Sequence, residues 1–254
     1  DLYRNGGKMR PYVIVSPDYD PTSGGIKVMW GLYGWLLAKG AEVYMNRLPE
    51  GRDVIAIYPE IHTGNPVQTD RIIRYVLNVP GVMGAQTQYG FIPGPTEFPG
   101  ENVYYFSRMF GKAKDEDHYM FLPVINLNIF KDQKKKRTKT CFLVGKGYNQ
   151  LKHPNDSIEL NREIAKDQQQ LANILNECKT FYCYDKLTAM MECSRLCGTQ
   201  VVYEGDYSME ELSKYEPGLN GINKELDVEE FRGHYEEMVQ LFSDKLDLFI
   251  STTQ

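Results

Sequence analysis

The stretch that decides the fold is FYCYDKLTAMMECSRLCGTQVV, residues 181–202. An apolar run is followed by Asp185, by a helical pattern from Lys186 to Cys197, by Gly198 and by a second apolar run. Short apolar runs bounded by turn residues are typical of buried strands, and glycine commonly ends a helix. The stretch therefore predicts a strand–helix–strand unit, which can hold a ligand at the carboxyl end of its sheet.

The same alternation extends through the rest of the chain. In the first half we expect strands at 12–16, 42–45, 53–58 and 102–106 and helices at 26–37 and 68–78. In the second half we expect strands at 140–144, 180–183 and 200–203 and helices at 160–175, 186–197 and 228–250. This order predicts an α/β fold with mostly parallel sheets covered on both faces. Residues 80–100 are expected to form a long loop, and such loops are often functional.

A basic segment separates the two halves. Residues 131–139 read KDQKKKRTK and hold six basic residues in nine. We interpret them as a solvated linker, with a basic surface for anionic lipid or phosphate as the alternative. The expected organisation is two Rossmann-like domains, at residues 1–130 and 131–254, with a cleft between them.

Composition narrows the function classes. The chain of 254 residues is 42% hydrophobic and has a formal net charge of -5, so no basic field argues for nucleic acid. Its five cysteines show no zinc-site spacing and are expected to be reduced, buried thiols of a cytoplasmic protein. No segment resembles a signal peptide, and the longest uncharged run, 75–96, is too broken by Gly and Pro to span a membrane.

The loop after residue 144 is a candidate phosphate site. Gly145 and Gly147 let a ligand approach the backbone, and Lys146 and Lys152 can offset the charge of a diphosphate. The third glycine of the dinucleotide fingerprint is absent, because Gln150 stands there. A plain turn at the strand exit is the alternative.

Two carboxylates in the opening stretch are candidates for binding ribose. A carboxylate accepts hydrogen bonds from two sugar hydroxyls, and Asp185 and Glu192 are both well placed for this. Asp185 can instead cap the following helix. Glu192 lies in an apolar helix, where an unpaired buried carboxylate is costly, so we expect it to face either solvent or a ligand.

Loops in the first half supply the candidate bases. Asp18 and Asp20 follow the first strand, and Glu60 and His62 follow the third, where open α/β sheets bind ligands. Structural loops are an equal alternative for all four. Acid pairs at this spacing are common by chance, and we expect no metal site. Residues 23–25, Ser-Gly-Gly, precede a helix whose backbone donors can meet an anion.

The two halves together resemble a GT-B glycosyltransferase. Residues 23–25, with the helix and Gly-Ala-Glu-Val at 40–43, resemble the start of that fold's acceptor domain. Residues 142–146, FLVGK, followed by Lys152, resemble the Gly-Arg/Lys and later Lys that grip the donor's diphosphate. Residues 192–202 resemble the Glu-to-Val-Val signature in which the glutamate binds the nucleotide ribose.

This resemblance implies a metal-independent glycosyltransferase in polysaccharide biosynthesis, with two parallel sheets facing across a cleft. Its substrates would be a nucleotide-diphosphate sugar and a glycan or lipid-linked acceptor, with no other cofactor, and it leaves open a peripheral membrane contact. The last helix could cross back to the first domain. The implied donor-binding residues are Gly24, Gly25, Lys146, Lys152, Asp185, Thr188, Glu192, Gly198 and Thr199. The implied base is Asp18, Asp20, Glu60 or His62.

Three other functions remain open. A nucleotide-sugar epimerase or hydrolase could use the same fold, and a noncatalytic module could bind a sugar nucleotide or glycan without turnover. A Rossmann oxidoreductase is disfavoured by the missing third glycine and by the lack of an acid for ribose after the second strand.

Overall fold

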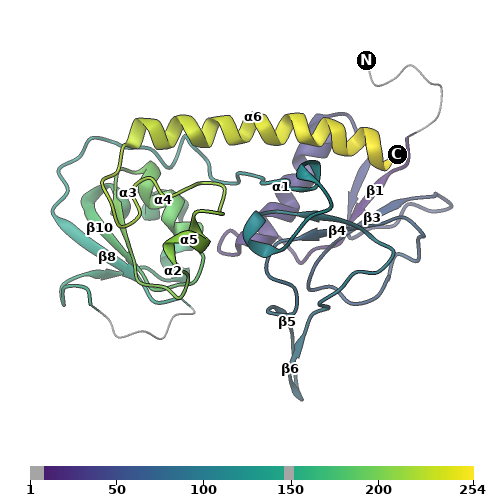
Figure 1. Ribbon diagram of the computed structural model, residues 1–254, viewed down its shortest axis with the longest axis horizontal. Helices are drawn as coiled ribbons and strands as arrows, with labels where there is room; N and C mark the ends of the chain where they lie inside the picture. Colours follow the sequence, from purple (N-terminus) through teal and green to yellow (C-terminus); the bar gives the residue numbers. More distant parts are fainter. Residues whose placement is uncertain (1–8, 146–151) are drawn as a thin grey trace. The chain divides into compact units, whose positions relative to one another are not determined.

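A computed structural model describes residues 9–145 and 152–254, and the chain divides into two compact units. Unit 1 comprises the chain up to Asp20, Gly25–Pro123 and Met238–Gln254; unit 2 comprises Pro21–Gly24 and Val124–Glu237. The long helix α6 (Val228–Thr253) begins in unit 2 and ends in unit 1 (Figure 1). The chain leaves the main segment of unit 1 and enters that of unit 2 between residues 123 and 124. The domain boundary expected from the sequence lies between residues 130 and 131.

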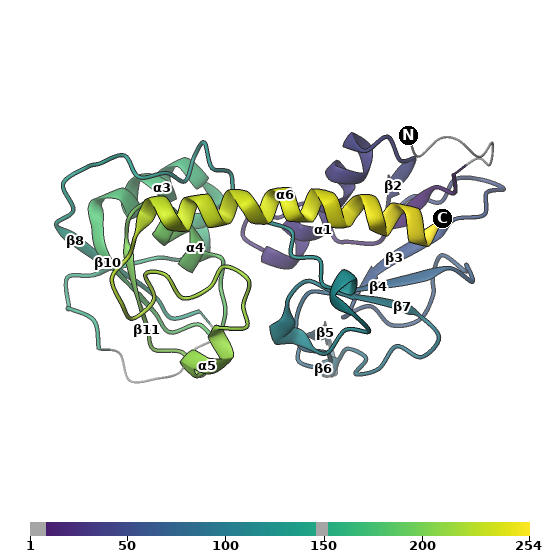
Figure 2. The same ribbon diagram turned by 45° about the horizontal axis from the view of Figure 1, so that its top comes forward.

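Unit 1 contains a five-stranded parallel sheet. Its strands are β1 (Tyr12–Ile14), β2 (Val43–Met45), β3 (Ile55–Pro59), β4 (Ile72–Val76) and β7 (Asn102–Tyr105), in the spatial order β2-β1-β3-β4-β7 (Figure 2). Every residue of β1 and β3 is buried. Near-continuous apolar runs of this kind are expected where a parallel strand is buried on both faces.

Two helices pack in the core of unit 1. Helix α1 (Gly24–Ala38) buries Val28, Met29, Leu32 and Leu36, which recur at helical spacing. The carboxyl-terminal part of α6 contributes Phe249, which stacks on Tyr12 with ring centroids 5.8 Å apart. The hydroxyl of Tyr12 also lies 2.6 Å from the Thr253 hydroxyl, so α6 is tied to the first strand by both apolar and polar contacts.

The helix predicted at 68–78 is wrong, because this segment contains strand β4. Ile72–Val76 pairs in parallel with β3 on one side and β7 on the other. Ile72, Ile73 and Val76 are β-branched and favour a strand. Their apolar spacing also fits a helix, because a strand buried on both faces has no alternation to reveal it.

Buried Arg74, in the middle of β4, fastens the loops around that strand. Its guanidinium donates to the carbonyls of Pro59 and His62, at 2.9 and 2.8 Å, and forms a two-point ion pair with Glu101. It also lies over the rings of Tyr58 and Phe98. The connections from β3 to β4 and from β4 to β7 contain no α-helix, and Arg74 holds these loops in place.

The loop expected at 80–100 contains an antiparallel hairpin, β5 (Gly84–Thr87) and β6 (Gly90–Pro93). After β7 come two short 3-10 helices, η1 (Arg108–Phe110) and η2 (Glu116–His118). Lys245 of α6 donates to the carbonyls of Glu116 and Tyr119, which fixes η2 against α6.

Unit 2 contains a four-stranded parallel sheet in the order β11-β10-β8-β9. Its elements are β8 (Lys139–Leu143), β9 (Ile158–Glu159), α2 (Arg162–Lys166), α3 (Gln168–Glu177), β10 (Cys178–Cys183), α4 (Met190–Leu196), β11 (Gln200–Tyr203) and α5 (Met209–Leu212). The prediction of an α/β chain with parallel sheets is thus confirmed. The single helix expected at 160–175 is two helices, because Asp167 ends α2 and caps α3 by accepting from the Gln170 amide.

A second buried arginine organises unit 2. Arg195, in α4, donates to the carbonyls of Gly218 and Asn220 at 2.8 and 3.0 Å. Its guanidinium carbon lies 4.0 Å from the centroid of the Phe231 ring. Arg195 therefore joins α4, the 218–220 turn and the start of α6. All five cysteines are buried, and none of them forms a disulfide bond within the described residues.

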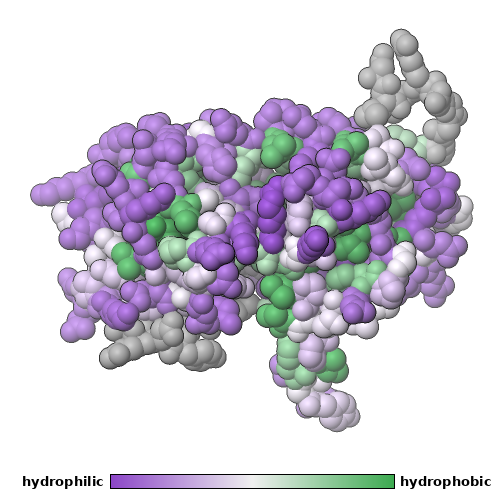
Figure 3. All heavy atoms as spheres, in the orientation of Figure 1, coloured by the Kyte–Doolittle hydropathy of each residue, from purple (hydrophilic) through white to green (hydrophobic). Residues whose placement is uncertain are grey.

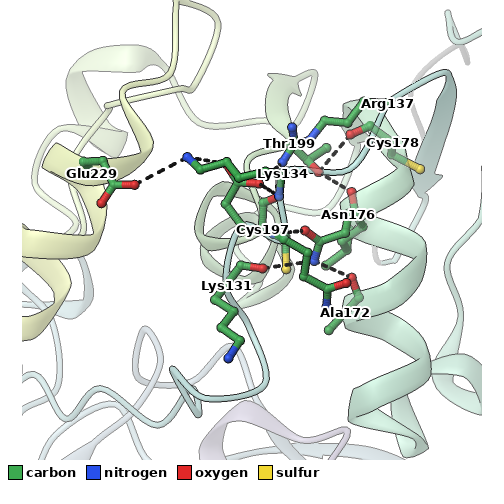
Figure 4. Close-up of polar contacts among 12 residues, drawn as sticks. Lys131, Lys134, Arg137, Ala172, Asn176, Cys178, Cys197, Thr199 and Glu229 are labelled. Carbon is green, nitrogen blue, oxygen red and sulfur yellow. Dashed lines mark hydrogen bonds and ion pairs between the residues drawn. The ribbon is translucent and has the colours of Figure 1, made fainter.

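Within unit 2, hydrogen bonds hold residues 131–137 of the basic segment in place, so this segment is not a solvated linker throughout (Figure 4). The Asn176 side chain donates to the carbonyls of Lys131 and Ala172 and accepts from the Gln133 amide. Arg137 pairs with Asp132 and donates to the Cys197 carbonyl. Sequence alone could not show this, because buried Asn176 lies 39 or more residues away along the chain.

No helix within residues 9–145 and 152–254 combines the length and the apolar character needed to cross a bilayer.

We predict that Asn176→Leu lowers the free energy of unfolding by roughly 2 kcal/mol or more, because it leaves buried backbone groups of 131–133 without partners. Asn173→Leu, at an exposed position of the same helix, is the control and should change stability little. Urea denaturation followed by circular dichroism measures both. Equal stabilities of the two variants would contradict the role given to Asn176.

Candidate functional site

Each of the two parallel sheets has one switch point, where the order in which successive strands are added to the sheet reverses. In unit 1 the chain goes from β1 to β2 on one side and then to β3 on the other side of β1. In unit 2 it goes from β8 to β9 and then to β10 on the other side of β8. Loops diverge at such switch points and leave a crevice at the carboxyl ends of the strands, where open α/β sheets bind ligands.

At the switch point of unit 2, Gly145 and Asp185 lie side by side. Gly145 follows β8, Asp185 follows β10, and a Cβ added to Gly145 would lie 2.0 Å from an Asp185 carboxylate oxygen. Gly145 also has a φ of +55°, in the left-handed region that favours glycine. The fold thus brings together two residues that the sequence analysis singled out, although they are 40 positions apart.

Lys152 lies at the same edge and is held by Tyr184, the residue before Asp185. The Lys152 amide donates to the Tyr184 hydroxyl at 2.8 Å, and the Lys152 ammonium pairs with Glu204 at 2.9 Å. Glu204 raises the pKa of Lys152, which keeps the ammonium charged. A phosphate that binds Lys152 must compete with Glu204. Lys146 lies outside the described residues.

An aromatic cluster lines this edge and was not recognised in the sequence. His153 stacks on Phe142 with centroids 3.7 Å apart, and its Nδ1 lies 3.1 Å from the Tyr184 hydroxyl. Tyr182 lies beside His153 at 6.2 Å. Phe142 and Tyr182 are both half-buried and pair in register on β8 and β10. No sequence signal distinguished them, because both strands read as short apolar runs.

The helix after Asp185 begins later than predicted. α4 starts at Met190, and the Thr188 hydroxyl accepts from the Met190 amide at 3.3 Å. Asp185 is therefore not its cap; its carboxylate accepts weakly from the Leu187 amide at 3.4 Å. Thr188 and Asp185 both lie in the 184–189 segment that leaves the carboxyl end of β10.

Glu192 is in the interior of unit 2. The residue is 2% exposed, and each carboxylate oxygen exposes less than 1 Å². Burial raises the pKa of Tyr215 well above its usual range, and the charge of Glu192 and its hydrogen bond with Tyr215 raise it further. Burial lowers the pKa of nearby Arg195 to about 10, and the charge of Glu192 partly opposes this. The prediction that Glu192 faces solvent is wrong, and its carboxylate is shielded from any ligand that binds at the surface in this structure.

Gly198 and Thr199 lie at the opposite edge of the sheet from Asp185. They connect the end of α4 to the start of β11, and the Thr199 hydroxyl donates to the carbonyls of Leu175 and Cys178. A Cβ on Gly198 would lie 2.3 Å from the Arg137 guanidinium. Gly198 therefore lies against Arg137, and Figure 4 shows Thr199 among the contacts around residues 131–137. The fold therefore separates them from Gly145, Lys152 and Asp185.

In unit 1, Glu60 lies at the switch point. It follows β3, is 3% exposed, and accepts from the amide of Leu77, which follows β4, at 2.9 Å. Burial raises the pKa of Glu60, and the Leu77 hydrogen bond and Arg74 only partly oppose this. Gly25 lies close by, because an added Cβ would contact Leu77 at 3.6 Å. Glu60 and Gly25 thus both lie next to Leu77.

His62 lies over the sheet face beside Tyr58. The two rings stack with centroids 5.1 Å apart, and Arg74 donates to the His62 carbonyl. Burial and the Arg74 charge lower the pKa of His62, so its imidazole is neutral at pH 7.

The loop after β1 holds the remaining candidates. Asp18 is exposed and Asp20 half-buried, and the Trp30 indole anchors the loop by donating to the Pro17 carbonyl at 3.0 Å. The Ser16 amide donates to the Asn46 side chain, and Ser16 Oγ is buried with no hydrogen-bond partner among the described residues. Gly24 is exposed at the start of α1.

A cavity of about 650 Å³ lies at the amino edge of the unit 1 sheet, away from the candidate residues. Its lining includes Arg52, Asp53 and Arg71. Parallel sheets bind ligands at their carboxyl edges, which is the opposite side from this cavity. In the described part of the chain, no three His, Cys, Asp or Glu side chains gather as a metal ion requires.

We predict that Glu60→Gln raises the free energy of unfolding at pH 7, because glutamine keeps an oxygen for the Leu77 amide and removes a charge that burial disfavours. A raised pKa in the folded state means that the stability of the natural protein falls as pH rises from the ordinary value of 4.5 through the folded pKa. The advantage of the variant should therefore grow over that range and shrink toward pH 4. Urea denaturation across pH measures it, with exposed Glu50→Gln as control; a constant difference would contradict the assignment.

No protein-family model, curated protein or solved structure matches the chain.

Proposed function

We propose that the chain is a glycosyltransferase that moves a sugar from a nucleotide-diphosphate donor to a glycan or other acceptor. The observation that carries this proposal is the meeting of Gly145 and Asp185 at the switch point of unit 2, with Lys152 at the same edge. The backbone at Gly145 can approach a ligand closely, and the Lys152 ammonium can bind a diphosphate. The Asp185 carboxylate can accept hydrogen bonds from the hydroxyls of an adjoining sugar. The GT-B arrangement of two sheets facing across a cleft is part of the proposal.

The donor would bind along the carboxyl edge of unit 2. The backbone at Gly145 and Thr188 approaches the diphosphate, and Lys152 exchanges Glu204 for a phosphate oxygen. Asp185 accepts from sugar or ribose hydroxyls and replaces Glu192 in this role, because Glu192 is enclosed by the core. The stack of Phe142 and His153 offers a flat surface for the nucleobase.

The acceptor would bind at the carboxyl edge of unit 1, with Glu60 as the base. A base works best when its pKa is near the working pH, and burial moves the pKa of Glu60 upward in that direction. Glu60 takes the proton of the acceptor hydroxyl, whose oxygen attacks the anomeric carbon of the sugar. The bond from that carbon to the diphosphate breaks, and Lys152 stabilises the departing negative charge. Asp18, Asp20 and His62 then have no direct part in the proton transfer.

The first prediction from this proposal concerns donor binding. A thermal-shift screen with UDP, GDP, dTDP and CMP should raise the melting temperature with one of them, since a ligand of the folded state stabilises it. Asp185→Ala should weaken that binding by roughly 1–3 kcal/mol in calorimetry, the usual loss for a charged hydrogen bond. Asp156→Ala, at the amino side of β9 in the same unit, should bind normally. No shift with any nucleotide would overturn the proposal.

The second prediction separates transfer from binding. Glu60→Gln should lower kcat by about 10²–10⁴-fold, the usual contribution of a general base, and leave donor affinity unchanged. Glu50→Gln is the matched control. Product analysis with a labelled donor identifies hydrolysis or epimerisation if the sugar never reaches an acceptor. Binding without any turnover identifies a noncatalytic module, and an unaltered rate in the Glu60 variant removes Glu60 as the base.

A further inference from the structure

The β5–β6 hairpin is a separate two-stranded ribbon of unit 1. Ala85 pairs with Ile92 and Gln86 pairs with Phe91, with Gln88 and Tyr89 in the turn between the strands. Figure 1 shows the hairpin extending away from the five-stranded sheet. Neither of its strands belongs to that sheet, so the ribbon contributes little to the core of the unit.

The root of the hairpin is fixed rigidly beside the candidate site. The Gly94 amide donates to the Met83 carbonyl at 2.8 Å. A Cβ on Gly94 would lie 3.1 Å from the Cα of Ile61 and 3.4 Å from the carbonyl oxygen of Glu60. The ribbon therefore begins where β3 ends, at the carboxyl edge of the sheet.

Large apolar side chains are exposed in β6, in the turn and just before β5. The exposed fractions are 91% for Tyr89, 57% for Ile92, 56% for Val82 and 52% for Phe91. Neighbouring side chains of a strand point to opposite faces, so Phe91 and Ile92 give each face of the ribbon one large apolar side chain. Figure 3 shows the resulting green side chains on the projecting hairpin. An exposed apolar cluster of this kind marks a contact surface.

The ribbon also lacks charge. The residues from Tyr75 to Thr96 include no Asp, Glu, Lys or Arg, in a chain of which these types form 25%. An apolar environment therefore requires no charged side chain of the ribbon to be desolvated. The nearest charged residues in the sequence, Arg74 and Glu97, lie at the two ends of this segment.

We propose that the β5–β6 hairpin docks unit 1 onto a lipid bilayer by entering its interfacial layer. A protein groove or a second copy of the chain would cover one face of the ribbon and leave Phe91 or Ile92 in water. A bilayer surrounds a projecting ribbon on both faces and at its tip. Aromatic rings such as those of Tyr89 and Phe91 are enriched at the depth where headgroups meet acyl chains.

The dimensions of the ribbon fit this location. Four residues per strand at a rise of about 3.3 Å give a length of roughly 13 Å. The headgroup layer on each side of a bilayer is roughly 5–8 Å thick, so the tip can reach the acyl boundary while the root stays in water. The unpaired edges of a two-stranded ribbon need water or headgroups as partners, which keeps the insertion shallow.

This docking differs in kind from attraction by the basic segment 131–139. That segment would bind anionic lipid, and its attraction is screened at about 1 M salt, where the Debye length is about 3 Å. The hairpin binds through apolar contacts and requires no lipid charge. Docking also does not depend on sugar transfer, so the two proposals can fail separately.

Flotation with phosphatidylcholine vesicles at about 1 M salt tests the proposal. The natural protein should float with the vesicles, and Phe91→Ser/Ile92→Ser should lower the partition coefficient by about tenfold or more. The control is Leu48→Ser/Leu241→Ser, which changes residues of unit 1 that are 52% and 54% exposed, and it should float like the natural protein. Circular dichroism melting verifies that both variants fold.

A second readout locates the tip. Tyr89→Trp adds an indole whose emission should shift to the blue when neutral vesicles are added, after subtraction of the spectrum of the natural protein with Trp30 and Trp35. Failure to float, or flotation only with anionic vesicles at low salt, would overturn the proposal. A concentration-dependent dimer that Phe91→Ser/Ile92→Ser abolishes, without vesicle binding, would overturn it in favour of self-association.

Discussion

Each unit depends on one buried arginine whose guanidinium donates hydrogen bonds to backbone carbonyls of the surrounding loops. Arg74 in unit 1 bonds to Pro59 and His62, and Arg195 in unit 2 bonds to Gly218 and Asn220. A buried cation is costly unless hydrogen bonds and a counter-charge compensate it, and Glu101 and Glu192 supply the opposite charge. Each arginine makes these hydrogen bonds only when its loops are in place, so it couples the loops to the strand or helix that carries it.

This constraint positions the carboxyl edges. In unit 1 the connections around β4 lack helices, so Arg74 takes over their usual task of fixing the strand ends. Glu60 at the end of β3 then meets the amide of Leu77 at the end of β4. In unit 2, Arg195 and Glu192 of α4 are buried in the interior, whereas Gly145, Lys152 and Asp185 lie at the carboxyl edge of the sheet. Glu192, the acid chosen from the family signature, is therefore enclosed by the core, and Asp185, seven residues earlier, is the half-buried carboxylate at the edge.

The hairpin shows how a site and a contact surface can share one support. Its root rests on Glu60 and Ile61 through Gly94, where only a residue without a side chain fits. Under the proposed function, docking at a bilayer would place the base of unit 1 near acceptors presented at the membrane surface. The hairpin root at Gly94 and the buried Arg74 therefore both contact the segment that follows β3.

The amino-acid sequence by itself determined the α/β class and the strands β1, β3, β10 and β11, because apolar runs and glycine turns are local signals. It also offered Gly145 and Asp185 as candidates, and the fold places these two residues side by side. It did not determine strand β4, whose apolar spacing also fits a helix, or the burial of Glu192, which depends on Tyr215 and Arg195. The separation of Gly198 and Thr199 from Asp185 likewise required the fold, since a helix carries its two ends to opposite edges of a sheet. Only tertiary structure decides such matters, because burial and pairing depend on residues that are distant in the sequence.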